Sequence, residues 1–99
     1  MKAYALALVD VNDPAAFAAY AAGAPATVAA FGGRYLVRGG NKQVLEGSLP
    51  PGRLLVVEFP SAEQAKAWYD SKEYQAIRPI RTGASKGTVL IAEGIGDAP

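Results

Sequence analysis

The chain has 99 residues, of which 51% are apolar and 19% charged, and ten basic against nine acidic side chains leave a net charge of +1. This length and composition predict a single globular domain over residues 1–99, and the balanced charge gives no reason to expect nucleic acid or an anionic membrane as a partner. Because cysteine and histidine are both absent, the sequence excludes disulfides, thiolate nucleophiles, cysteine-ligated metal sites and histidine-based catalysis.

No segment of the sequence is typical of a targeting signal or a membrane span. The apolar stretch from Ala3 to Val9 is short and runs directly into Asp10, which favours a strand over a signal peptide. No apolar run approaches the roughly 18 residues that a membrane helix needs. We therefore expect a soluble cytoplasmic protein.

The first third of the chain predicts a strand followed by a long helix. Residues 3–11 alternate small and large side chains, as in a strand with two distinct faces. Asp13-Pro14 is typical of a helix start, and the alanine-rich segment up to Ala30 favours a helix. Pro25 removes one backbone donor, so we expect a kink or a break there, and Gly32-Gly33 ends the helix.

The middle of the chain predicts two strands joined by a connection rich in glycine. Residues 34–38 predict the second strand and residues 53–59 the third, which is almost continuously apolar. Between them, Gly39-Gly40-Asn41 predicts a tight turn, residues 42–46 a short returning hairpin arm, and residues 47–52 a loop.

The last third predicts a helix, a second helical segment and a final strand. Ser61 begins a capping-box pattern that is typical of a helix start, and Ser71 indicates a second cap with a turn or helix after it. Residues 88–93 predict the last strand, and we expect residues 94–99 to form a flexible tail.

This order of elements, βαβ(β)βαβ, predicts an α+β split βαβ sandwich, with an antiparallel sheet and two helices on one of its faces. The helices then leave the other face open, although the first, third and last strands are apolar on both faces. We expect a second copy to cover the open face, which gives a homodimer with a closed α/β barrel. The alternative is a face on which scattered apolar residues contact water.

A series of segments, in this order and spacing, resembles the domain-of-unknown-function 1330 family over about residues 3–94. These segments are GGRYLVRGG (32–40), VLEG (44–47), VEFP (57–60), AWY (67–69) and YQ (74–75), followed by Arg78 and Arg81. The resemblance implies a ferredoxin-like protomer of the dimeric α/β-barrel superfamily, in agreement with the order of elements.

The resemblance implies no specific activity, because the activity of that family is not established. Relatives in the superfamily include cofactor-independent monooxygenases, muconolactone isomerases and haem-dependent chlorite-converting enzymes. The chain lacks histidine, the usual haem ligand, so the haem branch is disfavoured and we expect no cofactor.

Two carboxylates are candidate general bases, Glu58 first and Asp10 second. We expect both, together with Arg34 and Arg38, on the sheet face away from the helices or at strand ends, because burying an unpaired charge beneath helices costs several kcal/mol. If that face lines a dimeric barrel, its apolar walls raise the pKa of Glu58 toward neutrality. The alternatives are a structural salt bridge from Glu58 to either arginine, and a turn or cap at Asp10.

The turn after the second strand is a candidate anion site. Arg38 and Asn41 flank its two glycines, so a guanidinium and free backbone amides can converge on an anion there, with Arg34 on the same predicted strand. The alternative is a hairpin turn that needs glycine for its backbone alone.

The two helical segments in the last third of the chain carry the remaining candidates for ligand binding. Tyr74, Arg78 and Arg81 form a stripe that can hold a substrate carboxylate or an enolate, the acids of a partner subunit, or solvent. Tyr69 either packs the helix on the sheet or donates its hydroxyl to a pocket. No metal site is expected, because the carboxylates are dispersed.

Three functions remain open from the sequence. The first is a cofactor-independent enzyme of isomerase or monooxygenase type, acting by carboxylate general-base chemistry on a small anionic or phenol-like substrate. The second is a module that binds a small molecule without turnover, and the third is a structural protein whose function is its own dimerisation. The fold hosts all three and does not choose among them.

Overall fold

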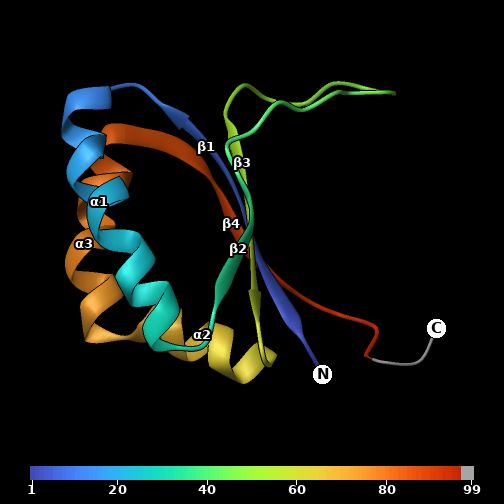
Figure 1. Cartoon of the computed structure of the whole chain (residues 1–99). Coiled ribbons are helices and arrows are strands. Elements are labelled where there is room, and N and C mark those ends of the chain that lie inside the picture. The colour runs from blue at the N-terminus through green and yellow to red at the C-terminus, as the bar shows by residue number, and fades with distance from the viewer. Residues whose placement is uncertain (97–99) are drawn as a thin grey trace.

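The structure, a computed structural model, describes residues 1–96 and consists of one antiparallel sheet with its helices on one side (Figure 1). Its elements in chain order are β1 (Ala3–Val11), α1 (Pro14–Ala30), β2 (Arg34–Arg38), β3 (Arg53–Phe59), α2 (Ala62–Asp70), α3 (Lys72–Ala84) and β4 (Ser85–Glu93). The strand order is β2-β3-β1-β4, and every neighbouring pair is antiparallel. The predicted α+β fold is confirmed, with the second helical unit divided into α2 and α3.

Side-chain caps begin all three helices at the residues that the sequence predicts. Asp13, Ser61 and Ser71 each accept a hydrogen bond from the backbone N–H three residues later, at 3.0 to 3.2 Å. Each cap pairs one of the amide groups that a helix start leaves without an intrahelical partner. Ser71 therefore ends α2 and begins α3, which turns the chain between them.

The predicted break at Pro25 is wrong, because α1 continues through this residue to Ala30. Proline removes only one backbone hydrogen bond, whereas the residues around it are anchored by packing and by hydrogen bonds. Thr27 is buried, donates its hydroxyl to the Ala24 carbonyl at 2.7 Å and accepts a hydrogen bond from Trp68 Nε1 at 3.0 Å.

The predicted hairpin arm at residues 42–46 is also wrong, because no strand forms there. Residues 39–52 instead run out and back as an irregular loop that projects from the sheet on the side away from the helices (Figure 1). The apolar side chains of this segment find no core to pack on, since Val44 is 51% and Leu45 83% exposed, so burial does not offset the entropy cost of ordering it as a strand. At the other end of the chain, β4 begins three residues earlier than predicted, at Ser85.

The C-terminal segment after β4 follows the expected tail only in part. Gly94 donates its backbone N–H to the carbonyl of Lys2 at 2.8 Å, which holds the start of this segment against β1. Residues 97–99 of the expected tail lie outside the described residues. No helix within residues 1–96 is long and apolar enough to cross a membrane.

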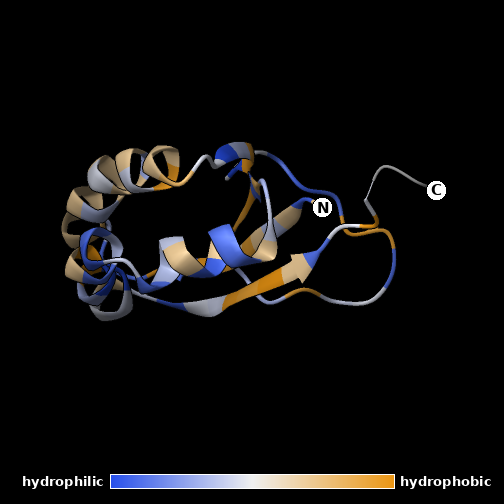
Figure 2. Cartoon of the chain, turned by 90° about the horizontal axis from the view of Figure 1, so that it is seen from below, coloured by the Kyte–Doolittle hydropathy of each residue, from blue (hydrophilic) through white to orange (hydrophobic). Residues whose placement is uncertain are grey.

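The core lies between the sheet and the helices. Figure 2 shows the most hydrophobic ribbon in the strands, whereas the helices are mixed. The largest side chains of the core are aromatic: Phe59 and Tyr74 are fully buried, and Trp68 packs between them with ring centroids at 5.4 and 4.3 Å. Burial of these rings fixes α2 and α3 on the sheet.

The opposite face of the sheet, which we call the outer face, has no helix over it (Figure 1). One row of apolar side chains crosses all four strands on this face through direct cross-strand partners: Leu90, Leu6, Val56 and Val37. Leu90 is 47% exposed and Val37 is 37% exposed.

Candidate functional site

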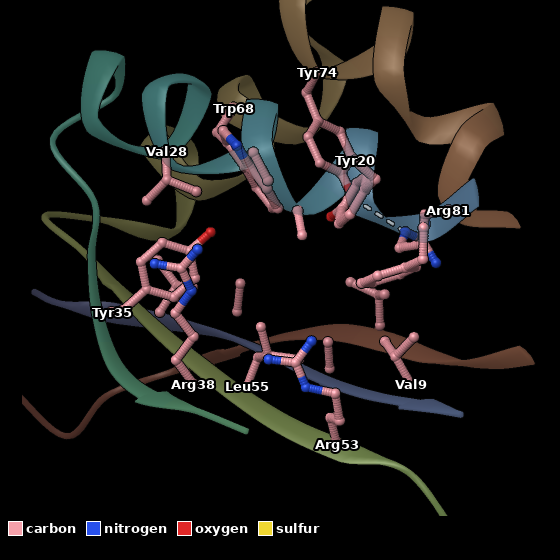
Figure 3. Close-up of a pocket in the computed structure, with 17 residues that line it drawn as sticks. Val9, Tyr20, Val28, Tyr35, Arg38, Arg53, Leu55, Trp68, Tyr74 and Arg81 are labelled. Atoms are coloured by element: carbon pink, nitrogen blue, oxygen red, sulfur yellow. Dashed lines mark hydrogen bonds between the residues drawn. The ribbon is translucent and has the colours of Figure 1, made fainter. Parts of the chain in front are cut away.

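A cavity of about 70 Å³ lies between the sheet and the helices (Figure 3). A single buried water needs about 10–15 Å³ of such space, so the cavity has room for several non-hydrogen atoms. Its lining residues with polar side-chain groups are Tyr20, Tyr35, Arg38, Arg53, Trp68, Tyr74 and Arg81, and the remainder of its wall is apolar. A small apolar cavity with a few polar groups is the usual form of a small-molecule site.

Small side chains on both layers create this cavity. On β1, Ala5 and Ala7 face the helices, and on α1, Ala21 and Ala24 face the sheet. Methyl groups do not fill the distance that the large aromatic rings set between the two layers elsewhere in the core. The alanine pattern of β1 and α1 therefore produces the space as well as the secondary structure.

A chain of hydrogen bonds joins Arg81, Tyr74 and Tyr20 at the helix side of the cavity. Arg81 Nε donates to the Tyr74 hydroxyl at 3.3 Å, and the hydroxyls of Tyr74 and Tyr20 lie 2.9 Å apart (Figure 3). Tyr74 and Arg81 are two turns apart on α3, so they share one face of that helix, as the predicted stripe requires. Tyr20 comes from α1, so the chain of hydrogen bonds also joins the two helices.

Arg81 is a buried cation without a counter-charge among residues 1–96. It is only 8% exposed, and within residues 1–96 no carboxylate lies within ion-pair distance of it. Its one hydrogen bond as a side-chain donor to a described residue is the bond from Nε to Tyr74, so its Nη groups have no partner among the described residues, and Arg81 is one of the residues that line the cavity. The sequence-based alternative that Arg81 lies in solvent is therefore wrong.

The Tyr20 hydroxyl stays neutral at ordinary pH. Burial raises its pKa above the usual value of 10.0, and the neighbouring Tyr74 hydroxyl raises the pKa further, whereas Arg81 lowers it by less. Burial likewise raises the pKa of Tyr35 at the other side of the cavity. Both phenols are therefore available to the cavity as neutral hydrogen-bond donors.

Two further arginines, Arg38 and Arg53, lie at the strand side of the cavity. The prediction that Arg38 shares a face with Arg34 is wrong, because β2 contains a β-bulge between Tyr35 and Val37. The bulge inserts one residue, so Arg38 turns to the same side of the sheet as Tyr35. The guanidinium reaches the rim of the cavity, where it remains exposed and so avoids the cost of burial beneath the helices.

In the single chain the pKa of Glu58 is lowered, whereas the rise expected from the sequence depends on a second copy that encloses this face. Glu58 lies on the outer face, where its Oε1 accepts a hydrogen bond from Arg34 Nε at 3.1 Å and pairs with Lys2 Nζ at 3.4 Å. Partial desolvation raises the pKa of Glu58, but the hydrogen bonds and charges of Arg34 and Lys2 outweigh it and hold the pKa below 4.5. The alternative interpretation, a salt bridge across neighbouring strands, describes this residue.

The other predicted site residues lie away from the cavity. Asp10 is exposed at the end of β1, and Asn41 is exposed on the projecting loop. Tyr69 packs beside Trp68, with ring centroids 6.2 Å apart, as in the packing interpretation. Arg78 lies over the Tyr69 ring at 6.0 Å. Of the predicted residues, the structure thus brings Arg38, Tyr74 and Arg81 together at the cavity.

Sequence reasoning missed three polar residues of the cavity, Tyr20, Tyr35 and Arg53. A signal was present for Arg53, because strand alternation places it on the same face as Leu55 and Val57, both of which line the cavity. Tyr20 follows Phe17 at helical spacing, and both residues line the cavity, but an aromatic at such a position is usually core. No cluster of acidic, histidine or cysteine side chains within residues 1–96 has the arrangement of a metal site.

Comparison with known proteins identifies the family of the chain and its fold. The family model described as "Domain of unknown function (DUF1330)" matches residues 2–95. Among solved structures, a protein of unknown function from Rhodopseudomonas palustris, RPA0582, has a TM-score of 0.77 at 17% identity over 99% of this chain and 84% of its own. The structure of Rv0793 from Mycobacterium tuberculosis has a TM-score of 0.57 at 17% identity over 100% of both chains. No curated protein matches the sequence.

Proposed function

The chain belongs to the DUF1330 family, whose function is unknown, and we propose that its cavity binds a small anionic molecule with an apolar body. The observation that carries the proposal is Arg81, a buried guanidinium that faces the cavity without a carboxylate partner in residues 1–96.

The electrostatics of the cavity favour an anion. A buried charge without a partner costs several kcal/mol, and an anionic group of a ligand offsets that cost when it pairs with Arg81. None of the described residues that line the cavity is acidic, whereas three of them are arginines. The hydroxyls of Tyr20 and Tyr74, which are hydrogen-bonded to each other, add polar groups beside Arg81.

The remainder of the wall suits an apolar body. Val9, Leu55 and Val57 from the strands and Phe17 and Val28 from α1 line the cavity, so a hydrocarbon chain or ring that enters it leaves water for apolar contacts. A carboxylate on such a body combines both features.

The proposal requires binding and no turnover. Glu58 and Asp10, the candidate general bases, do not line the cavity, and Glu58 is paired on the outer face. Proton transfer to a ligand in the cavity therefore has no carboxylate base among the described residues that line it. The non-catalytic binding module is accordingly the function that we propose.

We also propose that two copies of the chain pair through the outer face of the sheet. The apolar row from Leu90 to Val37 crosses that face without a helix over it, and burial of such a row is the usual reason for two sheets to associate. In this arrangement each chain keeps its own cavity, because the cavity lies on the opposite side of the sheet.

Calorimetric titration of the purified protein with hexanoate and benzoate, and with the uncharged hexanamide and benzamide, tests the binding proposal. We expect at least one carboxylate to bind ten-fold or more tightly than its amide, because only the carboxylate pairs with Arg81. In Arg81→Met this preference should disappear, whereas Arg81→Lys should keep part of it because the cation is retained.

Arg78→Met is the matched control, since it removes the same group from the same helix at a position that does not line the cavity. It should bind carboxylates as the unmodified protein does. Equal binding of carboxylates and amides by the unmodified protein, or equal loss in Arg78→Met and Arg81→Met, would show that the proposal is wrong. Circular dichroism establishes that each variant is folded.

A further inference from the structure

The geometry of the strand side points to a second anion subsite, formed by Arg38 and Arg53. We infer that the ligand carries two anionic groups joined by a short apolar body, as a dicarboxylate does, with one group at Arg81 and the other at these two arginines. This inference rests on the proposed function, because it assigns the second end of a ligand in the same cavity.

The β-bulge in β2 brings the two arginines onto one face of the sheet. After the bulge, Arg38 is the cross-strand partner of Leu55. Arg53 precedes Leu55 by two residues on β3 and therefore points to the same side. Arg38 and Arg53 are thus diagonal neighbours, a relation in which long side chains reach one another.

Local contacts hold both guanidinium groups. Arg38 Cζ lies 4.7 Å from the centre of the Tyr35 ring, in a cation–π arrangement. Arg53 lies directly against Gly39: a Cβ at this position would come within 2.6 Å of Arg53 Nε. Gly39 also has a φ of +72°, which disfavours any other residue. The glycine thus allows the turn and leaves the space that Arg53 occupies.

The charges at this side of the cavity have no acidic counterpart in the part of the chain that the structure describes. Neither Arg38 nor Arg53 has a carboxylate within ion-pair distance in the part of the chain from residue 1 to residue 96. Two like charges at diagonal positions repel each other, and an oxyanion between them removes that repulsion and accepts hydrogen bonds from both.

The two subsites lie on different walls of one cavity. Arg81 comes from α3 in the helix layer, whereas Arg38 and Arg53 come from the strands, with the side chain of Leu55 on the wall near them (Figure 3). A molecule that contacts both walls needs an anionic group at each end and an apolar part between them. A monocarboxylate satisfies only one of the two subsites.

Titration with matched monocarboxylates and dicarboxylates tests the inference. Hexanoate and adipate share a six-carbon body and differ by one carboxylate, and succinate, glutarate and pimelate vary the separation of the two groups. At equal ionic strength we expect one dicarboxylate to bind at least ten-fold more tightly than hexanoate. The double variant Arg38→Gln/Arg53→Gln should lower that dicarboxylate to the affinity of hexanoate and leave hexanoate binding unchanged.

Two further variants separate the subsite from a general effect of charge. Arg34→Gln removes a cation from the same strand on the outer face, so it should retain the advantage of the dicarboxylate. Gly39→Ala keeps every charge but displaces Arg53, so it should reduce the dicarboxylate advantage and leave hexanoate binding intact. Equal effects of Arg34→Gln and the double variant would overturn the inference.

The outcomes distinguish this inference from the proposed function. If hexanoate binds in an Arg81-dependent manner and no dicarboxylate binds more tightly, the proposed function stands and the second subsite is wrong. If no carboxylate binds, both are wrong. If the double variant weakens the association of two copies and not the binding of a dicarboxylate, Arg38 and Arg53 pair with acids of a partner copy, and the inference is again overturned.

Discussion

Arg81 and the two phenols beside it determine what the cavity can recognise. The guanidinium supplies a positive charge that is largely removed from water, and Tyr74 holds its Nε through a hydrogen bond of 3.3 Å. Tyr20 extends the chain of hydrogen bonds from α3 to α1. Because a buried charge is stabilised mainly by its immediate partners, the two tyrosines orient the arginine as well as line the cavity.

Ionisation of Tyr20 should lower the stability of the protein at alkaline pH. Burial and Tyr74 raise the pKa of Tyr20 in the folded protein, whereas the unfolded chain ionises near pH 10.0. The stabilisation is therefore complete below pH 10 and decreases as the pH rises toward the folded pKa, by at most about 1.4 kcal/mol per pH unit from this residue. Tyr20→Phe should show a smaller decrease, as measured by urea unfolding between pH 9 and 11.5.

At neutral pH the same variant measures the effect of the lost hydrogen bond alone. There Tyr20→Phe loses one partly buried hydrogen bond to Tyr74, and we expect a cost of about 1 kcal/mol in the free energy of unfolding. If the unmodified protein and Tyr20→Phe lose stability in parallel above pH 10, the ionisation of Tyr20 does not contribute and the assignment is wrong.

Individual residues of the site were predictable from the sequence where the local period is regular. The helical stripe of Tyr74 and Arg81 is correct because α3 is continuous over these two turns. Arg53 was within reach of the same reasoning, since strand alternation on β3 is also regular. Arg38 was assigned to the wrong face because the bulge before it leaves no marker such as glycine or proline in β2.

At the scale of elements, the strands and helices followed from period and capping, whereas the connections did not. The alternation of β1 and the caps at Asp13, Ser61 and Ser71 are local signals, and each predicted the element that the structure contains. Whether residues 42–46 form a strand depends on burial of their side chains by the rest of the fold, and Val44 and Leu45 remain exposed. The glycine-rich turn alone suggested a hairpin.

Helix α1 shows that tertiary packing outweighs an unfavourable residue, and it predicts a stabilising substitution. Pro25 lies inside the helix and donates no backbone hydrogen bond. Proline in a helix interior costs about 3 kcal/mol of stability. Its replacement also makes the unfolded chain more flexible, which lowers the gain in stability by about 0.4–1 kcal/mol. Pro25→Ala should therefore raise the free energy of unfolding by about 2 kcal/mol in urea denaturation.

Pro14→Ala is the matched control for this substitution. Pro14 stands in the first turn of α1, where the backbone N–H has no partner within the helix in any case. Its replacement should leave the free energy of unfolding unchanged or slightly lower. An equal response of the two variants would mean that Pro25 carries no special cost in the helix.

At the scale of the whole molecule, the two faces of the sheet have separate roles. The helix side encloses the cavity, and alanines on β1 and α1 leave its space open. The outer face carries the apolar row and the paired Glu58, and no helix covers it. The alternation of the strands predicts both the cavity and the second copy on one face, because alternation alone does not reveal how much of the space beneath the helices the side chains fill.

The proposed dimer and the proposed ligand site use opposite faces of the sheet, so assembly and binding should be independent of each other, which gives the last prediction. Leu90 is 47% exposed and is the cross-strand neighbour of Leu6 at the β4 end of the apolar row. Leu90→Asp places a charge at the proposed dimer interface, so light scattering after gel filtration should change from twice the mass of one chain to a single mass. Ala18→Asp, on the exposed side of α1, adds the same charge and should remain dimeric.

Both variants should bind one carboxylate ligand per chain, because the cavity is formed within one chain. A single mass for the unmodified protein would refute the dimer, and loss of binding in Leu90→Asp alone would mean that the cavity needs the second copy.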